Sequence, residues 1–470
     1  MLWSPKFVAA CVVVTAAVLL AVGLGLQEYR TFADQQNAAQ RLLEEEQRQT
    51  TDWMTLRQRV FRTADPMQIF VAGVHRDVGR YALVGRAADT SLRHSVYGDE
   101  PVFAVFRTFD LAFVVTVVLS LFAVVFTYDA VSGEREAGTL RLLSAYAVPR
   151  SLILSAKAAG LWLALVVPTA LSGLLGLAVV LAAGVHLDAQ DWMRLGVFAG
   201  ASVLYLSLFA LLGLAMSTLT RRSTTSFLGL LAIWVVTVLV LPRAGLVLAV
   251  QMVDVPSAAT IEAQRAGFEN RAWDRHLEDL EARWSERSRP MEGMTPEERQ
   301  EYEDERMWQW MQEDDAARRG VETEIQDQAD RLAETARLRR EEQRRLAFGL
   351  ARLSPAAAYQ LVATATAGTG VDMVGRWQQA IREYHGVFRD WLEQESGSSG
   401  THVMRRSGGG GAFSDTPTPI ELRGMPHFQP PAISIAEALR EAPLDLGLLA
   451  IEALLAFAVA LMGFLRYDVR

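Results

Sequence analysis

Residues 109–127 read FDLAFVVTVVLSLFAVVFT, an apolar run whose one charged residue, Asp110, stands near its beginning. At about 1.5 Å per residue, a helix of this length nearly spans the roughly 30 Å hydrocarbon core of a bilayer. Apolar and polar residues do not alternate along it, so the run predicts a membrane-spanning helix and not a strand of a membrane barrel. This stretch places the chain in a membrane.

Five more apolar runs share the pattern. Of 470 residues, 51% are hydrophobic, a composition that soluble folds rarely need. Pro168 and Pro242 interrupt two of the runs, where proline kinks a membrane helix more often than it ends one. The predicted spans are residues 7–26, 109–127, 158–183, 195–219, 226–253 and 446–465.

The first run has the shape of either a signal peptide or a first membrane helix. Lys6 precedes an apolar stretch from Phe7 to Leu26, which is longer than the apolar core of most signal peptides. No convincing small-residue cleavage pattern stands before Gln27. We therefore expect residues 1–26 to be retained as the first transmembrane segment.

Lys and Arg residues in short loops indicate the side of the membrane, because positive loops are retained in the cytoplasm. They gather before the first span, after the sixth, and in the second-to-third and fourth-to-fifth loops: Lys6, Arg135, Arg141, Arg150, Lys157, Arg221, Arg222, Arg466 and Arg470. Both termini, including the tail at 466–470, are then cytoplasmic. Residues 27–108 and 254–445 become two extracytoplasmic insertions.

The sequence thus predicts an all-α polytopic membrane protein, with six transmembrane helices and two large, mainly helical extracytoplasmic insertions. The first insertion opens with a polar helix from Glu28 to about Arg62. Residues 67–74 and 80–86 are either short strands or amphipathic segments on the membrane surface, and periodicity does not distinguish these alternatives.

The second insertion is rich in charged helix formers from residue 258 to 350, and Pro290 and Gly293 divide this stretch into two helices. Thr295 is the expected cap of the second helix, with Pro296 at its first position. An apolar seam in the first helix fits either packing against the second or a ligand-binding face, and we favour packing: Trp273, Leu277, Leu280 and Trp284.

Three further segments complete this insertion. Residues 353–365 predict an apolar helix, stopped by Gly368, that returns to the membrane surface. An amphipathic helix is expected from Trp377 to Trp391. Residues 396–411 are rich in Gly and Ser and predict a flexible linker.

Several kinds of chemistry are excluded by what the sequence lacks. No Gly-x-x-x-x-Gly-Lys-Ser/Thr loop occurs, so the chain lacks the backbone cradle and lysine that bind nucleotide phosphates, and any energy source would be another chain. The seven histidines have no metal-ligand spacing, and the single Cys11 lies inside the first apolar run, where a packing role is expected. We predict no catalytic residue, no cofactor and no metal in this chain. The net charge of −8 argues against a nucleic-acid partner.

Few ionisable residues fall inside the spans, which argues against an ion-driven transporter. Arg243 in the fifth span and Glu452 in the sixth lie at similar predicted depths. We expect these two side chains to form a structural ion pair.

The most informative loop is the one between the second and third spans, residues 128–157. It begins YDAVSGEREAGTLRLL at 128–143 and continues through Pro149 and Arg150 to Lys157. Its glycines allow tight turns, its leucines offer an apolar surface, and its charges offer complementarity to a partner: Gly133, Gly138, Leu140, Leu142, Leu143, Glu134, Arg135 and Glu136. A solvated, charge-rich loop is the alternative interpretation.

The pattern Glu-x-Glu-x-Gly-Thr-Leu at 134–140, followed by Pro149 and Lys157, resembles the signature after the second span of ABC-2-type permeases. The two large loops and the single final span are most similar to the subgroup that carries a domain of unknown function called DUF3526. Members often have an amphipathic elbow helix before the first span, whereas only residues 1–6 precede it here.

The resemblance implies that this loop docks on a separate ABC ATPase subunit, which binds ATP and Mg, and transmits its motion to the second and third spans. The residues expected to carry the coupling are Gly133, Glu134, Arg135, Glu136, Gly138, Thr139, Leu140, Leu143, Pro149 and Lys157.

The function that the resemblance implies is that of a permease subunit. It would pair with itself or with a second permease, and export a hydrophobic or amphipathic substrate or extract it from membrane lipid. The alternative is mechanotransmission, in which the outer domain moves to control a periplasmic or envelope partner and nothing crosses the membrane. A membrane receptor is a third, weaker interpretation.

Overall fold

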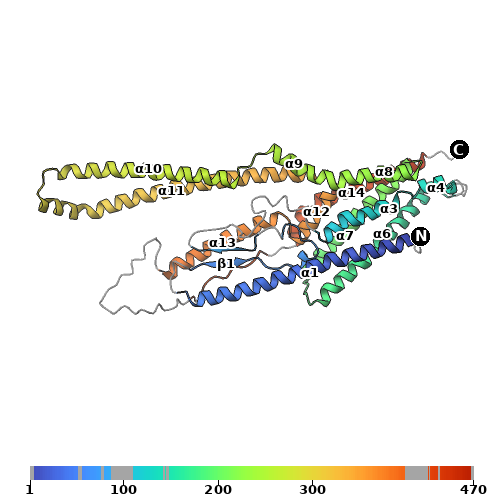
Figure 1. The fold of residues 1–470 in the computed structure, drawn as a ribbon, viewed down its shortest axis with the longest axis horizontal. Coiled ribbons are helices and arrows are strands. Elements are labelled where there is room, and N and C mark those ends of the chain that lie inside the picture. The colour runs from blue at the N-terminus through green and yellow to red at the C-terminus, as the bar shows by residue number, and fades with distance from the viewer. Residues whose placement is uncertain are drawn as a thin grey trace. The chain divides into compact units, whose positions relative to one another are not determined.

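The part of the chain described by the structure, a computed structural model, is almost entirely helical (Figure 1). It comprises residues 5–50, 56–75, 79–85, 109–140, 143, 148–396, 422, 424–431 and 435–466. The chain forms two compact units. Unit 1 consists of residues 1–246 and 350–470, and unit 2 of residues 247–349.

Six helices among the described residues are long and apolar enough to cross a membrane, which confirms the predicted all-α polytopic fold. The second and fifth each contain a π-helical stretch, η3 and η4, and Pro168 lies inside the third without ending it. The six are α1 (Pro5–Arg48), α2–η3–α3 (Leu111–Phe113, Val114–Leu119, Ser120–Thr127), α6 (Arg150–Ala182), α7 (Ala189–Leu219), α8–η4–α9 (Ser223–Trp234, Val235–Val240, Leu241–Met252) and α14 (Ile435–Leu465).

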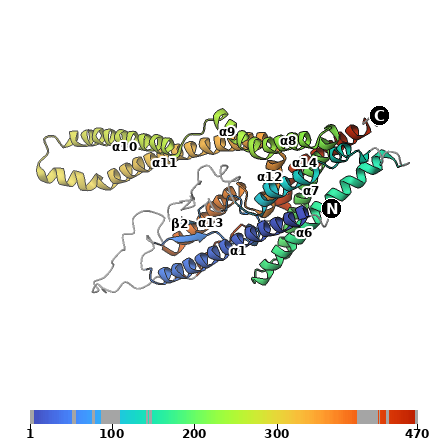
Figure 2. The ribbon, with the colours of Figure 1, turned by 45° about the vertical axis from the view of Figure 1, so that its right-hand side comes forward.

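Helix α1 packs along α6 (Figure 2). The hydroxyls of Thr15 and Ser172 lie 2.8 Å apart and share a hydrogen bond between the two helices. One turn further along α6, Gly176 leaves room for the side chains of Val18 and Val22. Small residues therefore let these two apolar helices approach closely, as is common in membranes.

Helix α12 (Pro355–Ala367) lies inside unit 1, so the prediction that it returns to the membrane surface is wrong. It packs against α7, α14 and η4. Its Tyr359 is fully buried, stacks on Tyr205 of α7 with ring centroids 4.9 Å apart, and shares a 2.8 Å hydrogen bond with Ser202. The physical reason is that α12 is apolar on nearly all sides and has no polar face to turn to water. Its predicted end is confirmed, with Gly368 in the left-handed conformation at φ +69°.

A buried arginine joins the first insertion, α7 and α12. Arg194, with 3% of its surface exposed, directs five hydrogen bonds at four acceptors. Asp65 Oδ2 accepts two at 3.1 Å, and Asp191 Oδ1 accepts one at 3.1 Å. The last carbonyls of α12, those of Thr366 and Ala367, accept the others at 2.9 and 2.6 Å. All five N–H groups of the guanidinium are satisfied.

The first insertion contains a two-stranded antiparallel sheet. Strand β1 (Gln58–Phe61) pairs with β2 (Tyr81–Val84), with Gln58 opposite Val84. The predicted helix to about Arg62 is therefore wrong in its last part, since α1 ends at Arg48. Of the two ambiguous segments, 80–86 contains a strand, whereas 67–74 begins in a 3-10 turn, η1 (Pro66–Ile69), capped by Asp65.

Helix α13 (Asp372–Ser396) contains the amphipathic helix predicted at 377–391. Residues 424–431 run beside it: the Tyr384 hydroxyl donates to the Pro426 carbonyl at 2.9 Å, and Phe428 packs on Trp377. The linker predicted at 396–411 lies outside the described residues, apart from Ser396 at the end of α13.

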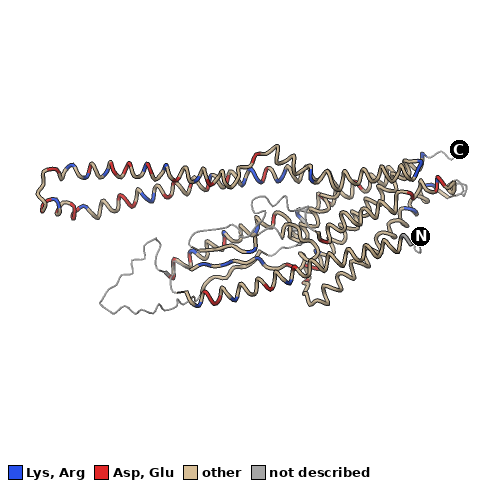
Figure 3. Tube along the Cα trace, in the orientation of Figure 1, with Lys and Arg blue, Asp and Glu red and all other residues tan. Residues whose placement is uncertain are grey.

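Unit 2 contains a helical hairpin of α10 (Ala258–Ser288) and α11 (Pro296–Ala351, which ends in unit 1), joined through η5 (Arg289–Met291). The two predicted helices and the Thr295 cap are confirmed: the Glu298 backbone N–H donates to the Thr295 hydroxyl at 3.4 Å, and Thr295 N donates back to Glu298 Oε2 at 2.9 Å. Of the predicted seam, Trp284 packs on Trp310 with centroids 5.9 Å apart, whereas Leu277 is exposed. Charged residues of both signs recur along both helices (Figure 3).

The expected ion pair between Arg243 and Glu452 is not formed. Within the described residues, no salt bridge joins these two side chains, and Arg243 is exposed. The ion pair at α14 is instead between Arg352 and Asp445, at 2.6 and 3.2 Å.

Candidate functional site

The loop at 128–157 begins against the end of α7. Its short helix α4 (Ser132–Glu136) follows the second span directly. The backbone N–H groups of Val131 and Ser132 both donate to the buried hydroxyl of Ser217, each at 2.9 Å. One serine of α7 therefore satisfies two backbone donors that the start of a helix leaves without a partner.

Arg135 caps the C-terminus of α7. Its Nη1 donates to the Thr220 carbonyl at 2.8 Å and its Nη2 to the Thr218 carbonyl at 3.3 Å. The last carbonyls of a helix lack partners within it and carry a partial negative charge, so a guanidinium is favourable there.

Glu136 caps the N-terminus of the next helix, where Arg135 caps the C-terminus of the one before. Its two carboxylate oxygens accept from the backbone N–H of Ser223 at 3.0 Å and from the Ser223 hydroxyl at 2.8 Å. Ser223 begins α8, and the residue before it, Arg222, supplies no side-chain cap. A carboxylate is favourable at a helix N-terminus. Adjacent residues of α4 thus hold the end of α7 and the beginning of α8.

Two basic residues tie the loop to α6 and α14. Lys157 of α6 forms an ion pair with Glu134, with 2.5 Å between Nζ and Oε1, and donates to the Ala130 carbonyl at 3.1 Å. Arg150, at the start of α6, donates from Nη1 to the Leu465 carbonyl at the end of α14, at 3.3 Å. Pro149 precedes it at the N-cap position. The loop is therefore bonded to four spanning helices, and the ends of α4, α6, α8 and α14 lie together in Figure 1.

The leucines of the loop differ from the expectation that they form a surface for a partner. Leu140 is only 1% exposed and packs in the chain's own core with Val131, Leu154 and Phe464. Leu143 is exposed, and Leu142 lies outside the described residues, as does Arg141. Burial of Leu140 fixes the loop to the bundle, because it removes a large apolar side chain from water.

The two glycines and Thr139 have separate roles. Gly138 has φ +72°, a left-handed conformation that a residue with a Cβ rarely adopts, and it lies just after α4. Gly133 lies within α4, where an added Cβ would make only an ordinary 3.4 Å contact with Asp129. Thr139 is exposed and donates back to the Glu134 carbonyl at 3.2 Å.

Among the exposed residues of the loop that the structure describes, four are apolar and larger than alanine, and we call them the docking surface for the role proposed below: Leu143, Val148, Pro149 and Leu152. Val148 and Leu152 were not among the predicted site residues. Their apolar character beside Pro149 in a basic loop was the available signal.

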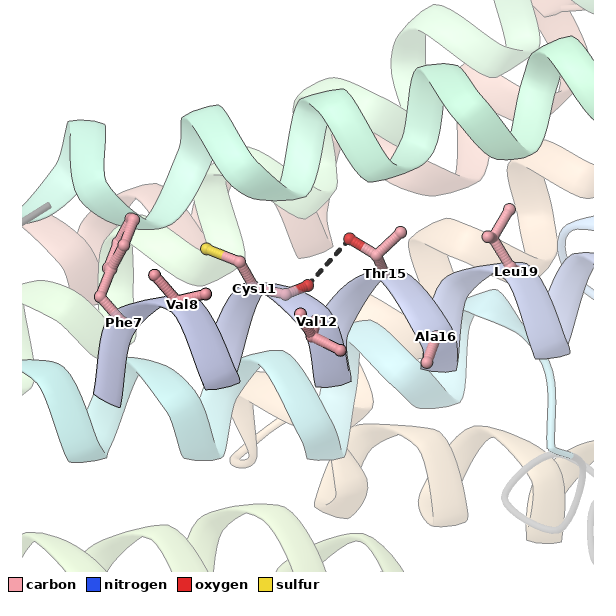
Figure 4. A pocket seen from close by; sticks show the side chains of 7 residues that line it. All are labelled: Phe7, Val8, Cys11, Val12, Thr15, Ala16 and Leu19. Carbon is pink, nitrogen blue, oxygen red and sulfur yellow. Dashed lines mark hydrogen bonds between the residues drawn. The ribbon is translucent and has the colours of Figure 1, made fainter. Parts of the chain in front are cut away.

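Two grooves among the spanning helices are lined mainly by apolar residues. One, of about 520 Å³, runs along α1 from Phe7 to Leu19, where the Thr15 hydroxyl donates to the Cys11 carbonyl at 2.8 Å (Figure 4). Another, of about 380 Å³, lies between α6, α7 and α14 and contains the hydrogen bond from Trp162 Nε1 to Ser207 Oγ, at 2.8 Å. The described residues contain no group of three or more His, Cys, Asp or Glu placed to hold a metal ion.

A comparison with models of protein families finds a match to this chain. The sequence model of a family described as ABC-2 family transporter protein matches residues 4–369, from the start of the first span to the residue after the glycine that ends α12. A comparison with curated proteins finds no match to this chain.

Proposed function

The chain belongs to the ABC-2 family of transporter proteins, and on this basis we propose that it is a permease subunit driven by a separate ABC ATPase subunit, which binds the ATP and Mg. It is a multi-pass membrane protein. We further propose that it acts in a bacterial inner membrane with both termini in the cytoplasm. The gathering of Arg135, Arg150 and Lys157 at one end of unit 1 supports this orientation, since basic loops are retained in the cytoplasm.

The observation that carries the proposal is the attachment of the loop at 128–157, the coupling segment, to four spanning helices. Arg135 holds α7, Glu136 holds α8, Lys157 belongs to α6, and Arg150 holds α14. Because packed interiors are not continuously deformable, a push on such a segment moves the helices bonded to it. This is what a coupling element requires.

We propose that the ATPase binds the docking surface, Leu143, Val148, Pro149 and Leu152. Exposed apolar residues suit insertion into an apolar cleft of a partner. The charged residues Arg135 and Glu136 then act indirectly, by positioning this surface.

A hydrophobic or amphipathic substrate, exported or extracted from membrane lipid, completes this proposal. The apolar groove between α6, α7 and α14 supports it, since six of its eight lining residues are Ala, Leu or Phe and the other two, Trp162 and Ser207, are hydrogen-bonded to each other. We also propose that the permease pairs with a second copy or with a sister permease, and that it belongs to the DUF3526 subgroup.

The test is co-purification of the chain with an ABC ATPase subunit co-expressed from the same organism, followed by ATPase assays in proteoliposomes. Leu152→Arg is expected to weaken binding of the ATPase about tenfold, which corresponds to about 1.4 kcal/mol. Leu277→Arg is the matched control, because Leu277 is exposed to a similar degree, 55% against 59% for Leu152, but lies in unit 2. Unchanged binding by Leu152→Arg would count against this docking surface.

A second candidate function, mechanotransmission, is favoured by how the hairpin is attached. The chain passes from the fifth span into unit 2 within α9 and returns within α11. At the return, a Cβ on Gly245 would lie 2.8 Å from Ala351 N, Arg352 pairs with Asp445, and Ser354 donates to the Thr237 carbonyl. Both ends of the hairpin are thus continuous with, or bonded to, the fifth and sixth spans.

The two functions differ in whether ATP hydrolysis is accompanied by movement of a substrate across the membrane. A transporter reconstituted with only its ATPase is expected to move lipid or an amphipathic probe across proteoliposomes. A force transmitter is expected to hydrolyse ATP without moving any probe. Replacing residues 258–350 by a short linker is expected to leave ATPase assembly intact in both cases, because the docking surface lies in unit 1.

A further inference from the structure

The turn of the helical hairpin is strongly acidic. Residues 292–315 hold ten Asp and Glu residues against two arginines, a net charge of −8 that equals the net charge of the whole chain. The remaining 446 residues are therefore neutral in sum, and the acidity of this protein is concentrated at one place on unit 2.

Ion pairs within the hairpin leave much of this charge unbalanced. Away from the turn, charges are matched across or along the helices, as in Arg275–Glu324 at 3.1 Å and Arg318–Glu322 at 3.0 Å. Near the turn, Arg287 pairs with both Glu313 and Asp314 at 2.9 Å. Of the ten carboxylates in this stretch, eight form no ion pair with any residue that the structure describes: Glu292, Glu297, Glu298, Glu301, Glu303, Asp304, Glu305 and Asp315. Such a cluster produces a negative potential that attracts cationic surfaces.

Large apolar side chains are exposed in the middle of these carboxylates. Trp308 is 70% exposed, Met311 54% and Met307 40%. Their spacing of three and four residues puts them on one face of α11, with Asp304 one turn before Trp308 and Asp315 one turn after Met311. We call these five residues the tip face. Trp and Met are residue types enriched at protein interfaces. In these three residues the side chains remain largely uncovered by the rest of the described chain.

The tip face rests on a rigid base. Between Trp308 and Met311, Trp310 turns inward, is only 7% exposed, and packs edge-on against Trp284 of α10. The Arg287 guanidinium lies over both indole rings, 5.5 and 5.4 Å from their centroids. A preorganised apolar surface loses little conformational entropy on binding.

We propose that the tip face binds a protein partner whose surface holds an apolar pocket for Trp308 bordered by Lys and Arg. Charge selects this occupant, because anionic lipid headgroups and a second copy of the same acidic tip are both repelled. The proposal goes beyond the permease function and does not depend on where the ATPase docks.

The experiment uses the full-length chain in its native membrane, with photoreactive benzoylphenylalanine at position 312. Gln312 is exposed and lies one turn after Trp308, so that the tip face itself stays intact. The matched control has the same group at Gln326, an exposed glutamine of the same helix outside the acidic turn. The expected result is a covalent adduct with a protein other than this chain from position 312 and not from position 326. Mass spectrometry of the adduct identifies the partner and the peptide it contributes.

Three variants test the chemistry of the contact. Trp308→Ala and Asp304→Lys/Asp315→Lys are each expected to lower the adduct yield about tenfold, whereas Asp304→Asn/Asp315→Asn lowers it less. Exchange of the partner's crosslinked Lys or Arg residues for Glu is expected to restore the adduct with the double-lysine variant. All altered residues are exposed on a helix, so the hairpin is expected to keep its circular dichroism.

Several results would overturn the proposal. They are the absence of any protein adduct from position 312, an adduct only with lipid or with a second copy of this chain, and a yield unaffected by charge reversal. If the double-lysine variant lost its helical signal, the asparagine variant with Trp308→Ala would decide the matter, since it removes the same interactions without reversing charge.

Discussion

Lys157 and Glu134 form an ion pair of 2.5 Å that links the second turn of α6 to α4. The two residues belong to the two sides of one loop, so the pair closes the coupling segment on itself. Lys157 also donates to the Ala130 carbonyl, which the ion pair alone does not explain.

Exchanging these two charges is expected to separate the ion pair from the backbone contact. Glu134→Gln and Lys157→Met should each destabilise the chain, and a double-mutant cycle should give a coupling free energy of about 0.5 kcal/mol, because the pair is partly exposed. The Glu134→Lys/Lys157→Glu exchange should recover this coupling but not the bond to Ala130. Thermal unfolding in detergent measures the stability of each variant. A coupling free energy of zero would show that the ion pair contributes nothing to stability.

Removing the Glu136 carboxylate is expected to loosen the start of α8. Ser223 N–H loses its acceptor in Glu136→Ala, at a cost of about 1 kcal/mol, typical of a lost helix cap. Hydrogen exchange should become faster at the first turn of α8 and stay unchanged at Leu230, further along the same helix. Equal exchange at Ser223 in the variant and the natural chain would mean that water replaces the cap without loss.

Arg194 is expected to be the residue whose removal costs most. Arg194→Met leaves Asp65 and Asp191 without their buried partner, a change that typically costs about 3–5 kcal/mol. Arg194→Lys should retain only part of the stability of the natural chain, because an ammonium group cannot make five hydrogen bonds in a fixed plane. Arg243→Met is the control, since Arg243 is an exposed arginine that pairs with no described carboxylate. Unfolding midpoints in detergent compare them, and similar midpoints for Arg194→Met and Arg243→Met would contradict this account.

Helix α7 offers two glycines with opposite expectations. A Cβ on Gly213 would overlap the Thr127 side chain of α3, whereas a Cβ on Gly196 would meet nothing within 4 Å. Gly213→Ala should therefore destabilise the chain by about 1–3 kcal/mol through overpacking. Gly196→Ala should be neutral or slightly stabilising, because alanine favours a helix. The same unfolding assay compares them, and a harmless Gly213→Ala would mean that α3 and α7 are free to move apart.

Acid is expected to loosen the turn of the hairpin. Hydrogen bonds from Arg287 and Gln309 lower the pKa of Glu313 below its usual value. A carboxylate with a lowered pKa stabilises the folded state above its unfolded pKa, about 4.3, and this contribution disappears as the pH falls through the folded pKa. Spin labels at Glu281 and Gln312, one on each helix, should show a broader distance distribution at pH 3 than at pH 7. Arg287→Leu should show the broader distribution at pH 7 already, and a pH response that survived in this variant would assign the effect to another group.

The spans were predictable because length and apolar character decide whether a helix crosses a bilayer, and α1, α6 and α14 follow that rule directly. The burial of α12 was not predictable, since a helix of thirteen residues is too short to cross a bilayer and periodicity cannot show what covers a helix that is apolar on nearly all sides. The end of α1 was misplaced because residues 58–61 gain their structure from pairing with 81–84, a contact that local sequence does not reveal.

In the candidate site too, some features were predictable from the sequence and others were not. The residue types at 133–140 indicated a special loop, but the partners of Arg135 and Glu136 lie more than eighty positions further along the chain. Nothing in the loop itself identifies these side chains as helix caps. Leu140 was expected at a surface for the same reason, because its neighbours Leu154 and Phe464 come from other helices.

The two caps made by Arg135 and Glu136 have one more consequence. The turn from Thr220 to Arg222 is gripped on both of its flanks by a single short helix, so it cannot act as an independent hinge. The fourth and fifth spans should then tilt together, as one rigid pair.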